Sequence, residues 1–290
     1  MSNPRIALAT CRDLPDWEVD DRPLVTALES LNATVREIPW DDKETNWSEF
    51  DATLIRTTWD YYWQLNAFLV WANKVPRLHN SASLIEWNTH KRYLRDLESA
   101  GVAVAPTVWL PAGSEADIQK VLRDLGSDRG FIKPQIGANA RHTLRFDTQS
   151  IADAQRHVDE LIADHDLMVQ PYLSSVEQEG ELSAIFIDGE FTHGVRKIPV
   201  PGDYRVQDDW GATDEPYVFS ADEVETAKFA ANIKGELLYA RVDYLRGDDG
   251  TLLLNELEVA EPSLFFRHGP HAAYRLAECL IERCRAADRL

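Results

Sequence analysis

The strongest constraint on the fold lies near the C-terminal end, where two apolar runs flank the sequence GDDG at residues 247–250. Strand-like runs separated by a short turn rich in Gly and Asp predict a β-hairpin. Centring the turn on Asp248 and Asp249 sets the register of the two strands. The predicted pairs are Leu245 with Leu252, Asp243 with Leu254, Arg241 with Glu256, and Tyr239 with Glu258.

Side chains alternate between the two faces of a strand, so this register also predicts which residues share a face. One face carries the charged residues and three leucines, namely Arg241, Asp243, Glu256, Glu258, Leu245, Leu252 and Leu254. The other face carries Leu253, Asn255 and Leu257. Because neither face is polar throughout, we expect the hairpin to be partly buried.

Clustered carboxylates on a partly buried face repel one another and lose hydration unless a cation lies between them. Oxygen-only ligands suit Mg²⁺, which binds through one or two carboxylates while phosphates and waters complete its octahedron. The ordinary explanation for charges in strands is a solvated outer face, which needs no cation. We favour the magnesium site.

The composition limits the partners. With 290 residues and 44% hydrophobic residues, the chain has room for about two domains. Its net charge of -19 argues against nucleic acid or an anionic membrane, which are bound through clustered Lys and Arg. No apolar run predicts a membrane span or a signal peptide, so we expect a cytoplasmic protein. The three cysteines lack CxxC spacing, which argues against a structural zinc site.

The first 80 residues alternate strand and helix. Strands are predicted over residues 5–10, 33–39 and 51–58, and a helix over 22–31. This order predicts a small parallel sheet of the doubly wound type, with ligand loops at residues 10–13 and 56–60. No GxGxxG follows the first strand, which argues against a dinucleotide site. We interpret most aromatic residues of 59–75 as helix packing, whereas Arg56 and Asp60 flank a strand end and are candidates for function.

The middle of the chain adds two lysines and a second hairpin. A helix is predicted over residues 83–100 with Lys91 on it, and Lys133 lies in an apolar strand, where an ammonium is costly without an anionic partner. Residues 136–143, IGANARHT, form a turn of the kind that folds over phosphates. A hairpin with its turn at residues 188–189 ends in Arg196 and Lys197, and a long polar loop over 199–216 contains Arg205.

These motifs together resemble the ATP-grasp fold, as in glutathione synthetase and D-alanine ligases. The resemblance rests on a helix lysine, a strand lysine before a turn, VQPYL, GELSAIFIDGE, RVDYL and LNELE in this order. Closer similarity to the cycloserine-forming ATP-grasp cyclo-ligases lies in RTTWDYYW, EWNTHKRYL, GVRKIPVPGDYRVQ and ELEVAEPSLFF. The resemblance spans nearly the whole chain. It implies a Rossmann-like substrate domain at residues 1–83 and an ATP-grasp domain at 84–290, with a lid at about 90–168 and a central antiparallel sheet at about 169–290.

The resemblance also implies a role for each matching residue. ATP phosphates are contacted by Lys91 and Lys133, and the adenine pocket is lined by Gln170, Pro171, Tyr172 and Leu173. Glu181 or Glu177 holds the ribose hydroxyls, and Mg²⁺ is held by Asp243, Glu256 and Glu258. Family members commonly have Asn where Glu258 stands. The cations that screen the reacting phosphoryl group and carboxylate are Arg196, Lys197, Arg205 and Arg241.

The implied activity is an ADP-forming ligase that activates a small amino-acid-like carboxylate as an acyl phosphate for attack by an amine or similar nucleophile. Intramolecular closure, as in cycloserine formation, is what the closer similarity suggests. The alternatives are an intermolecular dipeptide-type ligase, an ATP-grasp kinase that releases a phosphorylated product, and a nucleotide-binding module without turnover. A homodimer is compatible with each of them.

Overall fold

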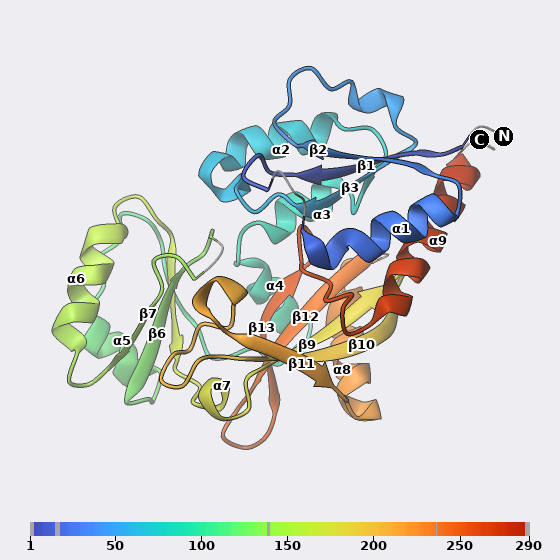
Figure 1. Ribbon diagram of the computed structural model, residues 1–290. Helices are drawn as coiled ribbons and strands as arrows, with labels where there is room; N and C mark the ends of the chain where they lie inside the picture. Colours follow the sequence, from blue (N-terminus) through green and yellow to red (C-terminus); the bar gives the residue numbers. More distant parts are fainter. Residues whose placement is uncertain (1–2, 15–17, 138–139, 236, 288–290) are drawn as a thin grey trace.

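The computed structural model describes residues 3–14, 18–137, 140–235 and 237–287, which fold around three β-sheets (Figure 1). The first sheet is parallel in the order β2-β1-β3-β4, as predicted for the N-terminal region. Its strands are β1 (Arg5–Thr10), β2 (Thr34–Pro39), β3 (Ala52–Thr57) and β4 (Leu78–His79). The helices of this region are α1 (Arg22–Ser30), α2 (Leu65–Lys74) and α3 (Ala82–Asn88), with short 3-10 turns at Val19–Asp21, Trp47–Glu49 and Tyr61–Gln64.

The second sheet is antiparallel in the order β11-β10-β9-β12-β13. Its strands are β9 (Glu181–Ile187), β10 (Glu190–Ile198), β11 (Thr213–Tyr217), β12 (Tyr239–Arg246) and β13 (Leu252–Glu258). The predicted turn between β9 and β10 is confirmed: Asp188 and Gly189 have φ values of 52° and 74°, the left-handed conformation that a two-residue hairpin turn requires. Short helix α7 (Ser175–Gln178) precedes β9, and α8 (Ala221–Asn232) begins with a capping box between Ser220 and Glu223.

The third sheet, in the order β5-β8-β6-β7, stands apart from the other two on the left of Figure 1. It contains β5 (Val108–Leu110), β6 (Arg129–Pro134), β7 (Leu144–Asp147) and β8 (Leu167–Pro171). Helices α5 (Ile118–Asp124) and α6 (Ile151–Leu161) cover one face and share a core with it. The other face is thereby left toward the five-stranded sheet.

One hydrophobic core joins the parallel sheet to the five-stranded sheet. It contains Leu8 and Leu24 from the N-terminal region, Ile185 from β9, and Leu276 from the C-terminal helix α9 (Pro270–Ala287). A second core, on the opposite face of the five-stranded sheet, includes residues of α8 and of α4 (Tyr93–Ser99). Among the described residues, no helix combines the length and the apolar composition that crossing a bilayer requires.

Two predicted elements need correction. The helix predicted over residues 83–100 is two helices, α3 and α4, and Lys91 lies in the turn between them, where its backbone N–H donates to the carbonyl of Gln135 (2.7 Å). The loop predicted over 199–216 ends early, because residues 213–217 form β11 by pairing with β10. That loop also contains a 3-10 turn at Asp208–Trp210. Polar composition alone could not reveal an edge strand.

Candidate active site

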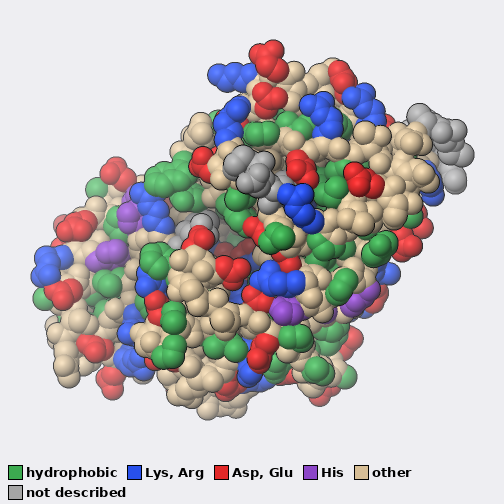
Figure 2. All heavy atoms as spheres, viewed as in Figure 1, with side chains coloured by type: hydrophobic (Ala, Val, Ile, Leu, Met, Phe, Trp, Pro, Cys, Tyr) green, Lys and Arg blue, Asp and Glu red, His purple; other side chains and the backbone are tan. Residues whose placement is uncertain are grey.

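A cavity of about 360 Å³ is lined by residues from the five-stranded sheet and the third sheet, and by segments that follow strands of all three sheets. The third sheet contributes Lys133 and Gln170, the five-stranded sheet contributes six charged side chains, and Trp59 and Tyr61 follow β3 of the parallel sheet. Figure 2 shows acidic and basic side chains mixed around a hollow near the middle of this face. The lining is thus charged on the side of the hairpin and aromatic on the side of the parallel sheet.

The register of the β12–β13 hairpin differs from the predicted one. The four charged residues share a face as predicted, but Leu252 and Leu254 pack into the core on the other face. Arg241 lies opposite Glu258 and Asp243 opposite Glu256, rather than opposite Glu256 and Leu254. The turn is one residue longer than predicted, and a bulge at Asn255 adds another residue to β13. Each shift alone would exchange the two faces, but together they restore the original one.

Asn255 lies on the charged side of the hairpin, not on the opposite face as predicted. Its side-chain amide donates to Glu181, and its side-chain carbonyl accepts from the ammonium of Lys133 (3.0 Å). Lys133 belongs to β6 of the third sheet, so this bulge residue connects two sheets across the cavity. The prediction failed here because it assumed a regular strand.

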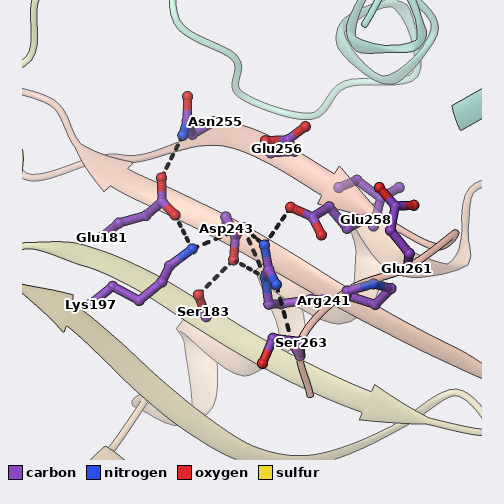
Figure 3. Close-up of polar contacts among 12 residues, drawn as sticks. Glu181, Ser183, Lys197, Arg241, Asp243, Asn255, Glu256, Glu258, Glu261 and Ser263 are labelled. Atoms are coloured by element: carbon purple, nitrogen blue, oxygen red, sulfur yellow. Dashed lines mark hydrogen bonds and ion pairs between the residues drawn. The ribbon is translucent and has the colours of Figure 1, made fainter. Parts of the chain in front are cut away.

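Asp243 is the centre of the buried ion-pair network in Figure 3. Its carboxylate accepts from Arg241 Nε (3.0 Å), from the hydroxyl of Ser183 (2.6 Å) and from Lys197 Nζ (3.2 Å). Arg241 also pairs with Glu258, and Lys197 also pairs with Glu181. Burial opposes ionisation of Asp243, but Arg241 and Lys197 outweigh it and lower the pKa of Asp243 to about 2.

The two predicted phosphate lysines reach the hairpin from outside it. Lys91 Nζ lies 2.7 Å from Glu256 Oε1 and 3.4 Å from the carbonyl of Gly137. Lys133 is 7% exposed and has the Asn255 contact but no carboxylate in ion-pair distance among the described residues. Burial lowers the pKa of Lys133 to about 8, because the attraction from Glu256 offsets it only in part. The charged form of Lys133 is therefore destabilised by burial, and a bound anion would stabilise it.

Among the hairpin residues that line the cavity, acidic side chains outnumber basic ones. Burial and the repulsion from Glu256 raise the pKa of Glu258 to about 7, despite the nearby Arg241. Burial and the repulsion from Glu258 and Glu256 raise the pKa of Glu261 to about 8. Additional positive charge at this place would favour the ionised form of both carboxyl groups.

The fit of this donor set to Mg²⁺ can be tested residue by residue. Among the described residues, no three metal-ligating side chains converge closely enough to hold an ion as they stand. Glu256 and Glu258 each use one carboxylate oxygen for a cation and have a second oxygen without a hydrogen-bond partner among the described residues. Both oxygens of Asp243 accept hydrogen bonds. Glu256 and Glu258 therefore fit a hard cation directly, whereas Asp243 fits only if Arg241 or Lys197 releases it.

The predicted adenine-binding residues Gln170, Pro171, Tyr172 and Leu173 all line the cavity. Tyr172 packs in a small cluster with Val176 and Val206, and Phe131 and Tyr204 pack against it. Tyr204 and Thr143 share a hydrogen bond (2.9 Å) between the polar loop and the β6–β7 turn. Of the predicted phosphate turn over 136–143, residues 138 and 139 lie outside the described residues.

Two candidate residues are not at the cavity. Arg196 points to the opposite side of β10 from Lys197 and pairs with Glu215 on β11. Glu177 pairs with Arg129 and Arg145 and accepts from the hydroxyl of Tyr172. Arg205 does line the cavity, where it stacks on Trp210 and pairs with Asp203 (2.5 Å).

The candidates Arg56 and Asp60 do not line the cavity, and both are bound to other residues. Arg56 is buried and bound to Asp21 through two hydrogen bonds of 3.0 Å, and Asp60 accepts from the indole of Trp40 (2.8 Å). Sequence reasoning gave no role to Ser183, Asn255 and Glu261, or to the cavity faces of Trp59 and Tyr61. The motif LNELEVAEP contains Asn255 and Glu261, but only the bulge and the following turn bring them to the cavity.

Comparison with known proteins gives consistent results along the chain. The family described as "D-cycloserine synthetase DcsG, N-terminal domain" matches residues 6–80. The cycloserine biosynthesis protein DcsG from Streptomyces lavendulae is 30% identical, over 92% of this chain and 94% of that protein. The crystal structure of D-cycloserine synthetase DcsG has a TM-score of 0.88 and 28% identity, and covers 97% of this chain and 99% of that one.

More distant structures share the fold. The ATP-grasp ligase PsnB, complexed with a phosphomimetic variant of a minimal precursor, Mg and ADP, has a TM-score of 0.67 and 17% identity, over 96% of this chain and 98% of that one. D-alanine–D-alanine ligase from Bacillus anthracis, complexed with ATP, has a TM-score of 0.68 and 14% identity, over 100% and 99% of the two chains.

Proposed function

Because the chain belongs to the family of ATP-grasp ligases that includes the cycloserine biosynthesis protein DcsG, we propose that it activates a small amino-acid-like carboxylate as an acyl phosphate and then closes a C–N bond. The observation that carries the proposal is the contact of two lysines with the β12–β13 hairpin across the cavity. Lys91 and Lys133 reach from two other segments to Glu256 and Asn255. The phosphates of ATP could replace Glu256 and Asn255 as partners of the two lysines, and Mg²⁺ could replace Lys91 as the partner of Glu256.

In this proposal Lys91 and Lys133 bind the phosphates of ATP, and residues 170–173 bind adenine. Glu181 holds the ribose hydroxyls, and its bonds to Lys197 and Asn255 orient its carboxylate. Glu256 and Glu258 hold Mg²⁺, joined by Asp243 when its partners release it. The bound ion would neutralise the charge on the transferring phosphoryl group.

Arg241 and Lys197 are the cations placed for the reacting groups. Both are buried against Asp243, which fixes their positions before substrate arrives. A substrate carboxylate oxygen attacks the γ-phosphorus and ADP leaves; a nitrogen then attacks the acyl carbon and phosphate leaves. Arg241 and Lys197 reduce the repulsion between the two anions in the first step.

We further propose that the nitrogen belongs to the same molecule, so that a ring closes. The family relationship favours a single small substrate. Residues 1–83 would supply the substrate-side wall of the site, and the segment at about 90–168 would act as a lid over the nucleotide. Exclusion of water by this lid would protect the acyl phosphate from hydrolysis.

The test is ADP release from Mg²⁺·ATP with a panel of small amino acids, followed by mass analysis of the product. Added hydroxylamine should trap the activated carboxylate as a hydroxamate. A stable phosphorylated product without hydroxamate would instead establish a kinase. ATP binding without ADP release on any acid would contradict ligase chemistry altogether.

A further inference from the structure

Glu261 is a cavity carboxylate for which the ligase chemistry has no use so far. It lines the cavity three residues after Glu258, and Figure 3 shows the two side chains next to each other. Asp243, Glu256 and Glu258 each pair with a Lys or Arg. Glu261 has no ion pair or hydrogen bond to another side chain among the described residues. Its carboxylate therefore has no neutralising partner among the described residues.

The backbone around Glu261 is held in place by the N-terminal region. The indole of Trp59 donates to the Glu261 carbonyl (3.3 Å), and Arg56 donates to the Pro262 carbonyl (2.9 Å). On the other side, the hydroxyl of Tyr239 donates to the Ala260 carbonyl (2.9 Å). These contacts use only main-chain oxygens of residues 260–262, so they fix the position of Glu261 without occupying its side chain.

The surroundings of Glu261 suit a cation carried by the substrate. Trp59 and Tyr61 line the same cavity, and aromatic rings near a carboxylate are favourable neighbours for an ammonium group. Lys91, the cation whose charge acts on Glu261, already pairs with Glu256. Arg241, the proposed partner of the substrate carboxylate, donates to the carbonyl of Ser263 (3.2 Å), two residues after Glu261. One short segment thus adjoins groups for both ends of an amino acid.

We propose that Glu261 binds the protonated amino group of the substrate and thereby selects carboxylic acids that carry one. The inference rests on the proposed ligase function, because it places the substrate carboxylate near Arg241. Glu261 acts as a specificity-determining residue and takes no part in phosphoryl transfer. Charge pairing in a partly buried site makes the discrimination large.

The experiment compares acids that differ only in the amino group. Alanine and serine, in both configurations, are paired with propanoate and 3-hydroxypropanoate, and ADP release is measured with hydroxylamine as the common nucleophile. The proteins are the wild type, Glu261→Gln, Glu261→Asp, and the control Glu225→Gln on the exposed face of α8. Thermal unfolding and ATP binding show that each variant is folded and loaded.

We expect the wild type to prefer an amino acid over its desamino partner. Glu261→Gln should raise the KM for that amino acid by at least about tenfold and reduce the preference by a similar factor, with the KM for ATP nearly unchanged. Glu261→Asp should recover part of the preference, and Glu225→Gln should behave as the wild type. An undiminished preference in Glu261→Gln, or equal use of desamino acids by the wild type, would overturn the inference. Absence of ADP with every acid would instead refute the proposed function, and this inference with it.

Discussion

Replacing Lys133 by methionine should stabilise the protein while removing its affinity for nucleotide. Lys133 is 7% exposed, and its pKa falls from 10.5 to about 8 because burial disfavours the ammonium. Each pKa unit corresponds to about 1.4 kcal/mol, so holding Lys133 charged at neutral pH costs the folded protein about 3 kcal/mol. The substitution also removes the hydrogen bond to Asn255, worth about 1 kcal/mol. The net gain in the free energy of unfolding should be about 2 kcal/mol at pH 7.

The pH dependence has a defined sign. The unfolded chain binds more protons than the folded one between pH 8 and 10.5, so the Lys133 penalty fades as pH rises through that range, and the advantage of Lys133→Met fades with it. Urea unfolding at several pH values measures this difference.

Nucleotide should reverse the order of stability. A non-hydrolysable ATP analogue at a hundred times its Kd adds about 2.7 kcal/mol to the wild type, whereas the methionine variant should gain far less. Lys120→Met, at an exposed position on α5, serves as the control with unchanged nucleotide response. A Lys133→Met protein that is less stable than the wild type without nucleotide, or equally stabilised by it, would refute the reasoning.

Two further substitutions test the charge cluster, and a third tests whether Arg196 lies outside it. Burial raises the pKa of Glu258 from 4.5 to about 7, so the folded protein keeps a proton that the unfolded chain loses, and stability falls as pH rises through this range. Glu258→Gln should make this fall shallower in thermal unfolding measured at several pH values. An unchanged slope would disprove the assignment. Lys197→Met should abolish ADP formation and destabilise the fold by about 3–5 kcal/mol, since Asp243 and Glu181 lose a buried partner. Arg196→Gln, one residue away but directed to Glu215, should leave ADP formation near the wild-type rate, and a large loss would show that Arg196 reaches the site after all.

The sequence was sufficient where pattern follows directly from local geometry. The alternation of strand and helix predicted the parallel N-terminal sheet, and the two Gly-containing turns predicted the β9–β10 and β12–β13 hairpins. The four charged residues of the last hairpin share a face as predicted, although the predicted register is wrong by two residues at Arg241 and Asp243, and Leu252 and Leu254 lie on the other face. That outcome depended on two compensating irregularities, which no periodicity reveals.

Long-range contacts were beyond the reach of the sequence pattern. Asn255 became a bridge between two sheets only because of the bulge, and Lys91 reached Glu256 from a turn that had been predicted as helix. Arg196 and Lys197 are neighbours with equal charge, and strand alternation alone could not say which one faces the cavity. Glu261 depends on a main-chain clamp built by residues about 200 positions earlier.

The most direct test of the magnesium and nucleotide site is ADP formation by Glu256→Gln over a range of Mg²⁺ concentrations. Glutamine keeps the size of the side chain and an oxygen for Lys91, so thermal unfolding should stay near that of the wild type. With the carboxylate gone, Mg²⁺-dependent ADP formation should fall by at least about a hundredfold. Wild-type rates with an unchanged Mg²⁺ requirement would contradict the assignment of this hairpin to the metal and the triphosphate.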